Sequence, residues 1–176
     1  PNGAMVVLEN KTVLPKAWLA PVAVRVADPA DVLGALQNPQ FTPSVIAIVE
    51  SAPPIPMLGP GATLPNTGPG QVRVNKYEAE KIDLDAAVTM NSMLVLGEKY
   101  YKGWKATVDG KLTEIYPVNH VLRGIYLTPG MHKVEFVFDP TPFKIGKILT
   151  LASFAVFALF LVREIWLARR AKGAGA

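Results

Sequence analysis

The stretch Ile148–Val162 decides the fold, because it reads ILTLASFAVFALFLV and carries no charged residue. Its 15 residues are fewer than the roughly 20 that a helix needs to cross a bilayer. Extension to residues 143–167 gives 25 residues, since Lys144 and Lys147 can reach the headgroups with their amines. A helix from a soluble core normally shows a polar stripe, whereas apolar side chains surround this axis. We therefore expect residues 143–167 to form one transmembrane helix.

Basic residues gather at the C-terminal end of this helix and in residues 168–176, which we expect to be a basic cytoplasmic tail. The positive-inside rule then places the rest of the chain outside the cytoplasm. Along the helix, we expect apolar side chains to contact lipid and basic or aromatic side chains to mark the ends. The expected membrane anchors are Phe143, Lys147, Phe154, Phe157, Phe160, Arg163 and Trp166.

The charge balance argues against a nucleic-acid partner. The chain has 18 Lys and Arg against 14 Asp and Glu, but much of the basic excess lies in the membrane segment and tail. The remainder is close to neutral and offers no basic footprint for nucleic acid. The chain has no cysteine, which excludes disulfides, thiolate metal sites and cysteine nucleophiles.

The chain begins at Pro1 without a basic-then-apolar signal segment. Because an exported domain needs a targeting signal, we expect an N-terminal portion to be missing, by cleavage or by incomplete tracing.

Residues 1–50 are expected to form a small α+β segment of strand, helix and strand. The expected extended segments are Met5–Leu8 and Ala17–Ala20 continuing through Val22–Val26, broken by Pro15 and Pro21. A short helix is expected to follow Asp28, a good N-cap, with proline at its first position. The apolar run from Ser44 to Glu50 predicts a buried strand. Residues 51–70 are rich in proline and glycine and predict a linker or long surface loop.

Residues 71–140 predict a jelly-roll-like β-sandwich, so the fold class is mainly β (α+β) with a C-terminal membrane helix. Short apolar or alternating runs recur at about ten-residue spacing, as in two-sheet β folds. Asp109–Gly110 is a two-residue hairpin signal, because this pair tolerates positive φ. The expected strands are Val72–Tyr77, Ser92–Gly97, Trp104–Val108, Leu112–Tyr116, Val121–Leu127 and Met131–Phe138.

Two groups of residues are candidates for ligand binding. Tyr100, Tyr101 and Trp104 lie on one predicted turn and could stack on a sugar ring, although such clusters more often close a core. Asn119, His120 and Arg123 could orient an anionic glycan or a lipid phosphate. The alternative for this second group is a polar loop held by its own hydrogen bonds.

The sequence predicts no self-contained active site. Asp83 and Asp85 are interpreted as turn residues rather than calcium ligands. His120 and His132 are the only histidines, and their spacing does not suit zinc. There is no phosphate-binding glycine loop and no nucleophile elbow. We therefore expect this chain to be no enzyme and to hold no cofactor or metal.

Two longer segments carry a family resemblance: residues 94–111, LVLGEKYYKGWKATVDGK, and residues 115–136, IYPVNHVLRGIYLTPGMHKVEF. Together they resemble the C-terminal extracytoplasmic domain of YfhO-type bacterial membrane proteins. Residues 14–19 (LPKAWL) and 38–43 (NPQFTP) resemble the upstream part of that family. The chain departs from the family at Lys102, where proline is usual, and at His120, where an aromatic residue is more usual. Both positions fall on expected loops, so the departures concern loop contacts more than fold.

The resemblance implies a relation to multi-spanning glycosyltransferases that use lipid-linked sugar donors. Their expected catalytic acid lies in an early loop among N-terminal helices, which this sequence does not include. The resemblance implies a bacterial inner membrane location, with the folded domain extracytoplasmic. The leading hypothesis is a non-catalytic accessory domain that helps to place a glycan or lipid-linked substrate. Its expected partners are the lipid bilayer, the missing N-terminal membrane domain and a glycan.

A second hypothesis from a different class is a single-pass structural subunit of a larger membrane complex, for example respiratory or photosynthetic. In that role the helix would pack on helices of other subunits. The small residues Ala152, Ser153, Ala155 and Ala158 would allow close packing, although lipid-facing alanines explain them equally well.

Overall fold

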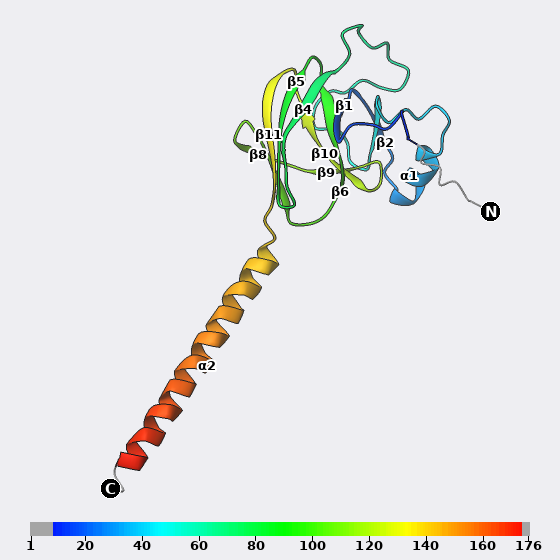
Figure 1. The fold of residues 1–176 in the computed structure, drawn as a ribbon. Helices are drawn as coiled ribbons and strands as arrows, with labels where there is room; N and C mark the ends of the chain where they lie inside the picture. Colours follow the sequence, from blue (N-terminus) through cyan, green and yellow to red (C-terminus); the bar gives the residue numbers. More distant parts are fainter. Residues whose placement is uncertain (1–8, 174–176) are drawn as a thin grey trace, which may run out of the picture. The chain divides into compact units, whose positions relative to one another are not determined.

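The computed structural model describes residues 9–173 of the chain, with side chains up to residue 167 (Figure 1). The expected strand Met5–Leu8 lies outside the described residues, as do residues 174–176 of the expected tail and the side chains of residues 168–173. The chain divides into two units, Pro1–Phe138 and Asp139–Ala176.

The first unit is built mostly from strands, with one short helix between β2 and β3 (Figure 1). Its elements are β1 Ala17–Ala20, β2 Val22–Arg25, α1 Pro29–Leu36, β3 Ile46–Val49, β4 Gly70–Tyr77, β5 Lys81–Val88, β6 Ser92–Lys99, β7 Trp104–Val108, β8 Lys111–Thr113, β9 Tyr116–Val118, β10 Leu122–Leu127 and β11 Gly130–Phe138. The second unit is formed by α2, Thr141–Gly173.

The strands form two sheets that pack face to face. One has six strands in the order β1-β6-β10-β9-β3-β2, and the other has five in the order β4-β5-β11-β7-β8. The core between them takes residues from both sheets, including Leu94 and Ile125 from the first and Leu84 and Phe136 from the second. The expectation of a mainly β fold with one C-terminal apolar helix is confirmed.

The N-terminal segment is part of this sandwich. β1 pairs antiparallel with β6, placing Ala17 beside Leu96, and β2 runs parallel to β3. Helix α1 connects β2 to β3, and the carboxylate of Asp28 caps it by accepting a hydrogen bond from the Ala30 N–H at 2.9 Å. Residues 17–49 therefore supply three strands of the six-stranded sheet, where the sequence suggested a separate α+β segment.

The proline-rich loop between β3 and β4 lies against the six-stranded sheet. Leu58 exchanges backbone hydrogen bonds with Pro21 and Ala23, at 3.3 and 3.2 Å. Met57 packs on a second apolar cluster that includes Met93 and Val95. The loop thus covers apolar side chains on this sheet, although its prolines cannot complete a strand ladder.

One strand was not predicted. β5 alternates buried and partly buried residues along its whole length, and Asp83 and Asp85 lie within it, so their interpretation as turn residues is wrong. Asp85 stands opposite Lys133, and Asp83 lies 3.3 Å from the Lys81 amine. The predicted strand Leu112–Tyr116 is also divided, because β8 ends at Thr113 and β9, in the other sheet, begins at Tyr116.

Helix α2 contains one segment that is long and apolar enough to cross a membrane, Thr141–Leu167, with 27 residues. At 1.5 Å per residue it extends about 40 Å, more than the about 30 Å of a hydrocarbon core. None of its most apolar stretch is buried within the structure, as expected for a lipid-facing helix. The hydroxyls of Thr150 and Ser153 donate to the carbonyls of Gly146 and Leu149, both at 2.9 Å, so neither is left unsatisfied.

Candidate functional site

The candidate site is a hollow beside the loop that connects β6 to β7. The hollow has a volume of about 320 Å³, and its lining includes Tyr100, Tyr101, Trp104, Thr113 and Ile115. Gly103 allows the loop to turn, because its φ of 106° is unfavourable for residues with a side chain. The three aromatic residues named from the sequence therefore line one hollow.

The aromatic rings of the hollow pack on the end of β11. The ring centroid of Trp104 lies 5.5 Å from that of Phe138, and the ring centroid of Tyr101 lies 6.3 Å from it. Tyr101 is 62% exposed, whereas Trp104 is only partly exposed. Trp104 is therefore a fixed wall of the hollow, and Tyr101 is its accessible face.

Arg123 supports Trp104 from within the sandwich. Its side chain is 2% exposed, and its Cζ lies 3.8 Å from the ring centroid of Trp104 and 5.7 Å from that of Phe136. Burial of an ion destabilises the folded state by several kcal/mol, and a desolvated cation–π contact offsets about 2 kcal/mol of that penalty. Burial lowers the pKa of Arg123, and the charge of Glu98 opposes that shift. Because the Arg123 guanidinium is buried, it does not reach a ligand at the surface. It supports the Trp104 ring from the core side of the hollow.

A polar cluster closes the same end of the sandwich. Glu98 accepts a hydrogen bond from the Tyr77 hydroxyl and lies 3.6 Å from the Lys16 amine. The Lys16 amine in turn lies 5.1 Å from the centroid of the Tyr77 ring. The hydrogen bond to Glu98 raises the pKa of Tyr77. Glu98 is therefore already engaged by neighbouring groups.

Asn119 and His120 have different environments from each other. Asn119 is buried, and its Oδ1 accepts a hydrogen bond from the Ile48 N–H at 2.9 Å, while its own N–H donates to the Ile48 carbonyl at 2.9 Å. His120 is exposed on the adjoining turn. The Tyr100 N–H donates to the Val121 carbonyl at 2.7 Å, which joins this turn to the loop of the hollow. The Asn119 side chain is therefore hydrogen-bonded within the sandwich, whereas the His120 side chain is exposed at the surface.

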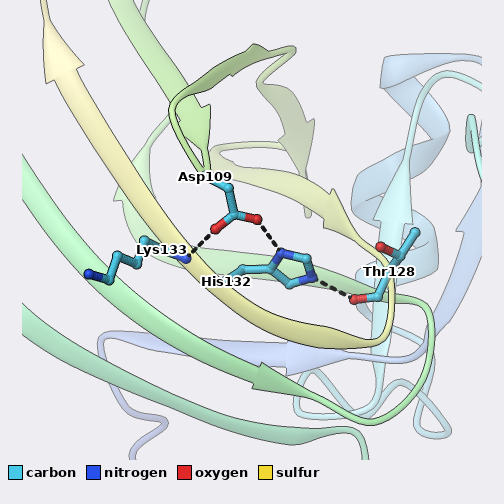
Figure 2. A network of polar contacts seen from close by, with 4 residues as sticks. All are labelled: Asp109, Thr128, His132 and Lys133. Atoms are coloured by element: carbon cyan, nitrogen blue, oxygen red, sulfur yellow. Dashed lines mark hydrogen bonds and ion pairs between the residues drawn. The ribbon is translucent and has the colours of Figure 1, made fainter.

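His132 and Asp109 form an imidazole–carboxylate pair that no sequence motif indicated (Figure 2). His132 Nδ1 lies 2.8 Å from Asp109 Oδ2, and Nε2 lies 3.0 Å from the Thr128 carbonyl oxygen. Asp109 Oδ1 accepts a further hydrogen bond from the Lys133 N–H at 2.8 Å. The hydrogen bond from His132 lowers the pKa of Asp109.

This pair joins two turns, and neither imidazole nitrogen is free. Both ring nitrogens of His132 face oxygen acceptors, so both can donate only when the ring is protonated. The pair connects the β7–β8 turn at Asp109 to the β10–β11 turn at Thr128, and the Lys133 side chain points away from it (Figure 2). Its nitrogen atoms are not available as a general base toward a substrate.

The described residues contain no group of three or more His, Cys, Asp and Glu side chains that could hold a metal ion. A second hollow, of about 310 Å³, lies beside His132 and shares Leu112 and Thr113 with the first. The aromatic hollow remains the candidate that combines accessible rings with a fixed support.

Residues 67–150 match the family model described as bacterial membrane protein YfhO. The matched residues include all of β4 to β11, the aromatic hollow and the first part of α2. The comparisons with curated proteins and with solved structures gave no match.

Proposed function

We propose that this chain, which matches the YfhO family of bacterial membrane proteins over residues 67–150, uses its β-sandwich to hold the sugar part of a glycan or lipid-linked substrate beside the bilayer that holds α2. In this role the sandwich positions a substrate without reacting with it. A membrane-associated envelope role follows from the family, and the placement of a sugar is the proposal.

The aromatic hollow is the observation that carries the proposal. Sugar rings present apolar C–H faces that stack on aromatic side chains, while hydroxyl groups need polar partners. Tyr101 and Trp104 supply rings on the wall of the hollow, and Thr113 supplies a hydroxyl. Because Arg123 and Phe138 contact the Trp104 ring, this wall is ordered before a ligand arrives.

The short connection to the membrane helix supports a substrate held at the bilayer. β11 ends at Phe138 and α2 begins at Thr141, so only two residues connect the sandwich to the anchor. Trp104 pairs with Phe138 in the β7–β11 register, so the hollow lies at the end of the sandwich from which this connection leaves.

A non-catalytic role is supported by the state of the one imidazole–carboxylate pair found among the described residues. Both nitrogens of His132 are engaged, as described above. General acid–base chemistry needs a group within hydrogen-bonding reach of the substrate, and this pair cannot extend one without breaking its own contacts.

Glycan titration of the full chain tests the proposal. The chain, with Trp166→Phe to remove emission from the helix, would be placed in nanodiscs and titrated with neutral and N-acetylated oligosaccharides while tryptophan fluorescence is followed. We expect a saturable change for at least one glycan. Tyr101→Ala should weaken binding about tenfold, since one stacked ring contributes about 1 to 1.5 kcal/mol.

Met131→Ala is the matched control, because Met131 is an exposed apolar residue at the opposite end of β11. Its glycan affinity should equal that of the parent chain. The proposal is wrong if no glycan of the panel produces a saturable change in the folded parent, or if Met131→Ala and Tyr101→Ala weaken binding equally.

A further inference from the structure

A group of exposed basic, aromatic and apolar side chains lies on and beside the β6–β7 loop, and three of them, Tyr100, Tyr101 and Lys102, also line the hollow. We define the interfacial rim as Lys99, Tyr100, Tyr101, Lys102 and Val121. All five are exposed, and the apolar or aromatic members include Val121 at 48% and Tyr100 at 37%. Val121 belongs to the rim because its carbonyl accepts the Tyr100 N–H at 2.7 Å.

The rim lies at the end of the sandwich that is tied to the membrane helix. The loop ends at Trp104, which pairs with Phe138, the last residue of β11. Three residue steps separate Phe138 from Thr141, the first residue of α2. Fully extended, these steps span about 11 Å. The chain connection therefore keeps Phe138 within about 11 Å of the first residue of α2.

The composition of the rim suits the headgroup layer of a membrane. Tyrosine is enriched at membrane interfaces because its ring is apolar and its hydroxyl is polar. Lysine can lay its methylenes on the apolar layer and keep its amine among phosphates. Glu98 in β6 is engaged by Lys16 and Tyr77, and Asp139 is paired with Lys144. Glu80, whose carbonyl accepts the Phe138 N–H at 2.8 Å, is exposed at this end and offsets part of the charge of Lys99 and Lys102.

We infer that the interfacial rim is a second membrane contact of this chain, which docks on the anionic phospholipid headgroups of the bilayer that holds α2. The lysine amines bind phosphate oxygens, and the side chains of Tyr100, Tyr101 and Val121 enter the interfacial layer. Docking holds this end of the sandwich at the bilayer surface. The inference does not require a glycan in the hollow.

The absence of cysteine allows a direct test in the full chain, because one introduced cysteine labels one site. Val121→Cys and Met131→Cys would each carry a small fluorophore in nanodiscs that contain a headgroup spin-labelled lipid as quencher. Met131, 75% exposed at the opposite end of β11, is the matched control position. We expect strong quenching at residue 121 in discs with phosphatidylglycerol, weaker quenching in pure phosphatidylcholine, and little at residue 131 in either.

Lysine neutralisation tests the electrostatic part. A lysine near an anionic surface shifts the docking equilibrium about fivefold. Lys99→Gln in the Val121→Cys chain should lower docking by about that factor, and the lipid dependence should shrink with it. Lys111→Gln, at the β7–β8 turn, should leave the quenching at residue 121 unchanged.

Three results would overturn the inference. The first is equal quenching at residues 121 and 131. The second is quenching at residue 121 that does not depend on anionic lipid. The third is an effect of Lys111→Gln as large as that of Lys99→Gln. Because the discs contain no glycan, these outcomes are independent of the sugar-binding proposal.

Discussion

The Cζ of Arg123 lies 3.8 Å from the centroid of the Trp104 ring, which joins the six-stranded sheet to the five-stranded sheet at one end of the core. A buried cation therefore stands where an aliphatic side chain would normally fill the space between two sheets. The wall of the aromatic hollow and the closure of the sandwich depend on the same contact.

Arg123→Ala should lower the free energy of unfolding by about 2 to 4 kcal/mol, because it leaves a cavity beside Trp104 and Phe136. Arg123→Met should recover most of that loss, since an apolar side chain of similar length fills the space without an ion to desolvate. Urea unfolding followed by tryptophan fluorescence measures both. Equal stability of the alanine variant and the parent would show that Arg123 is not part of the core.

Asn119→Gly should destabilise the sandwich by about 1 to 3 kcal/mol, because the buried Ile48 N–H loses its acceptor. The φ of Asn119 is 49°, which glycine accepts without strain. Asn119→Ala should cost about 1 kcal/mol more, since alanine adds strain at this φ. Thermal unfolding of the two variants side by side separates the lost hydrogen bond from the strain, and identical values would contradict the strain argument.

Two glycine substitutions should have opposite effects. A Cβ at Gly124 would lie 2.7 Å from Met93 Sδ and 2.8 Å from the Leu94 carbonyl oxygen, so Gly124→Ala should destabilise by about 1 to 3 kcal/mol. A Cβ at Gly34, within α1, would meet nothing within 4 Å. Gly34→Ala should therefore stabilise by about 0.5 to 1 kcal/mol through helix propensity. Chemical denaturation measures the change in the free energy of unfolding for each variant. Changes of the same sign in the two variants would refute the packing argument.

Acid should weaken the contact between Asp109 and His132. The folded pKa of Asp109 is lowered by the hydrogen bond from His132 and then by that from the Lys133 N–H. Its stabilising contribution is therefore complete above the unfolded pKa of about 4 and is lost as pH falls through the folded pKa. Asp109→Asn tolerates the φ of 52° but carries no charge, so it should flatten the decrease in melting temperature below about pH 4.

Circular dichroism between about pH 2.5 and 6 would give the melting temperatures of the parent chain and Asp109→Asn across this range. Asp85→Asn is a suitable control, because Asp85 lies in β5 and has no contact with His132 among the described hydrogen bonds. If Asp109→Asn retains the full acid dependence of the parent chain, the contribution assigned to Asp109 is wrong.

Local sequence signals were sufficient for much of this fold. The uniform apolar run at residues 148–162 predicted the long apolar helix α2, and Asp28–Pro29 predicted the start of α1. Asp109–Gly110 gave the β7–β8 turn, where both residues have positive φ. These features depend on neighbouring residues, so pattern and propensity can identify them.

The missed features depend on contacts between distant residues. β5 was not predicted because aspartate has a low intrinsic preference for strands, and two of its residues are Asp83 and Asp85. Pairing with β11 stabilises the strand in spite of that preference. Arg123 lies on the same face of β10 as the core residues Ile125 and Leu127, but arginine is rarely fully buried, so residue type argued against a core position. His132 and Asp109 belong to different turns, and the fold brings them together.

The pairing of β1 with β6 has a consequence for biosynthesis. Ala17 finds its partner Leu96 only after β2 to β5 have been made, and the segment matched to the family begins at residue 67, downstream of β1, β2 and β3. A chain truncated to that segment would leave one flank of β6 unpaired and part of its sheet unbuilt. Such distant pairing slows folding, so β1 stays unpaired, and accessible to chaperones or proteases, until β6 has been made.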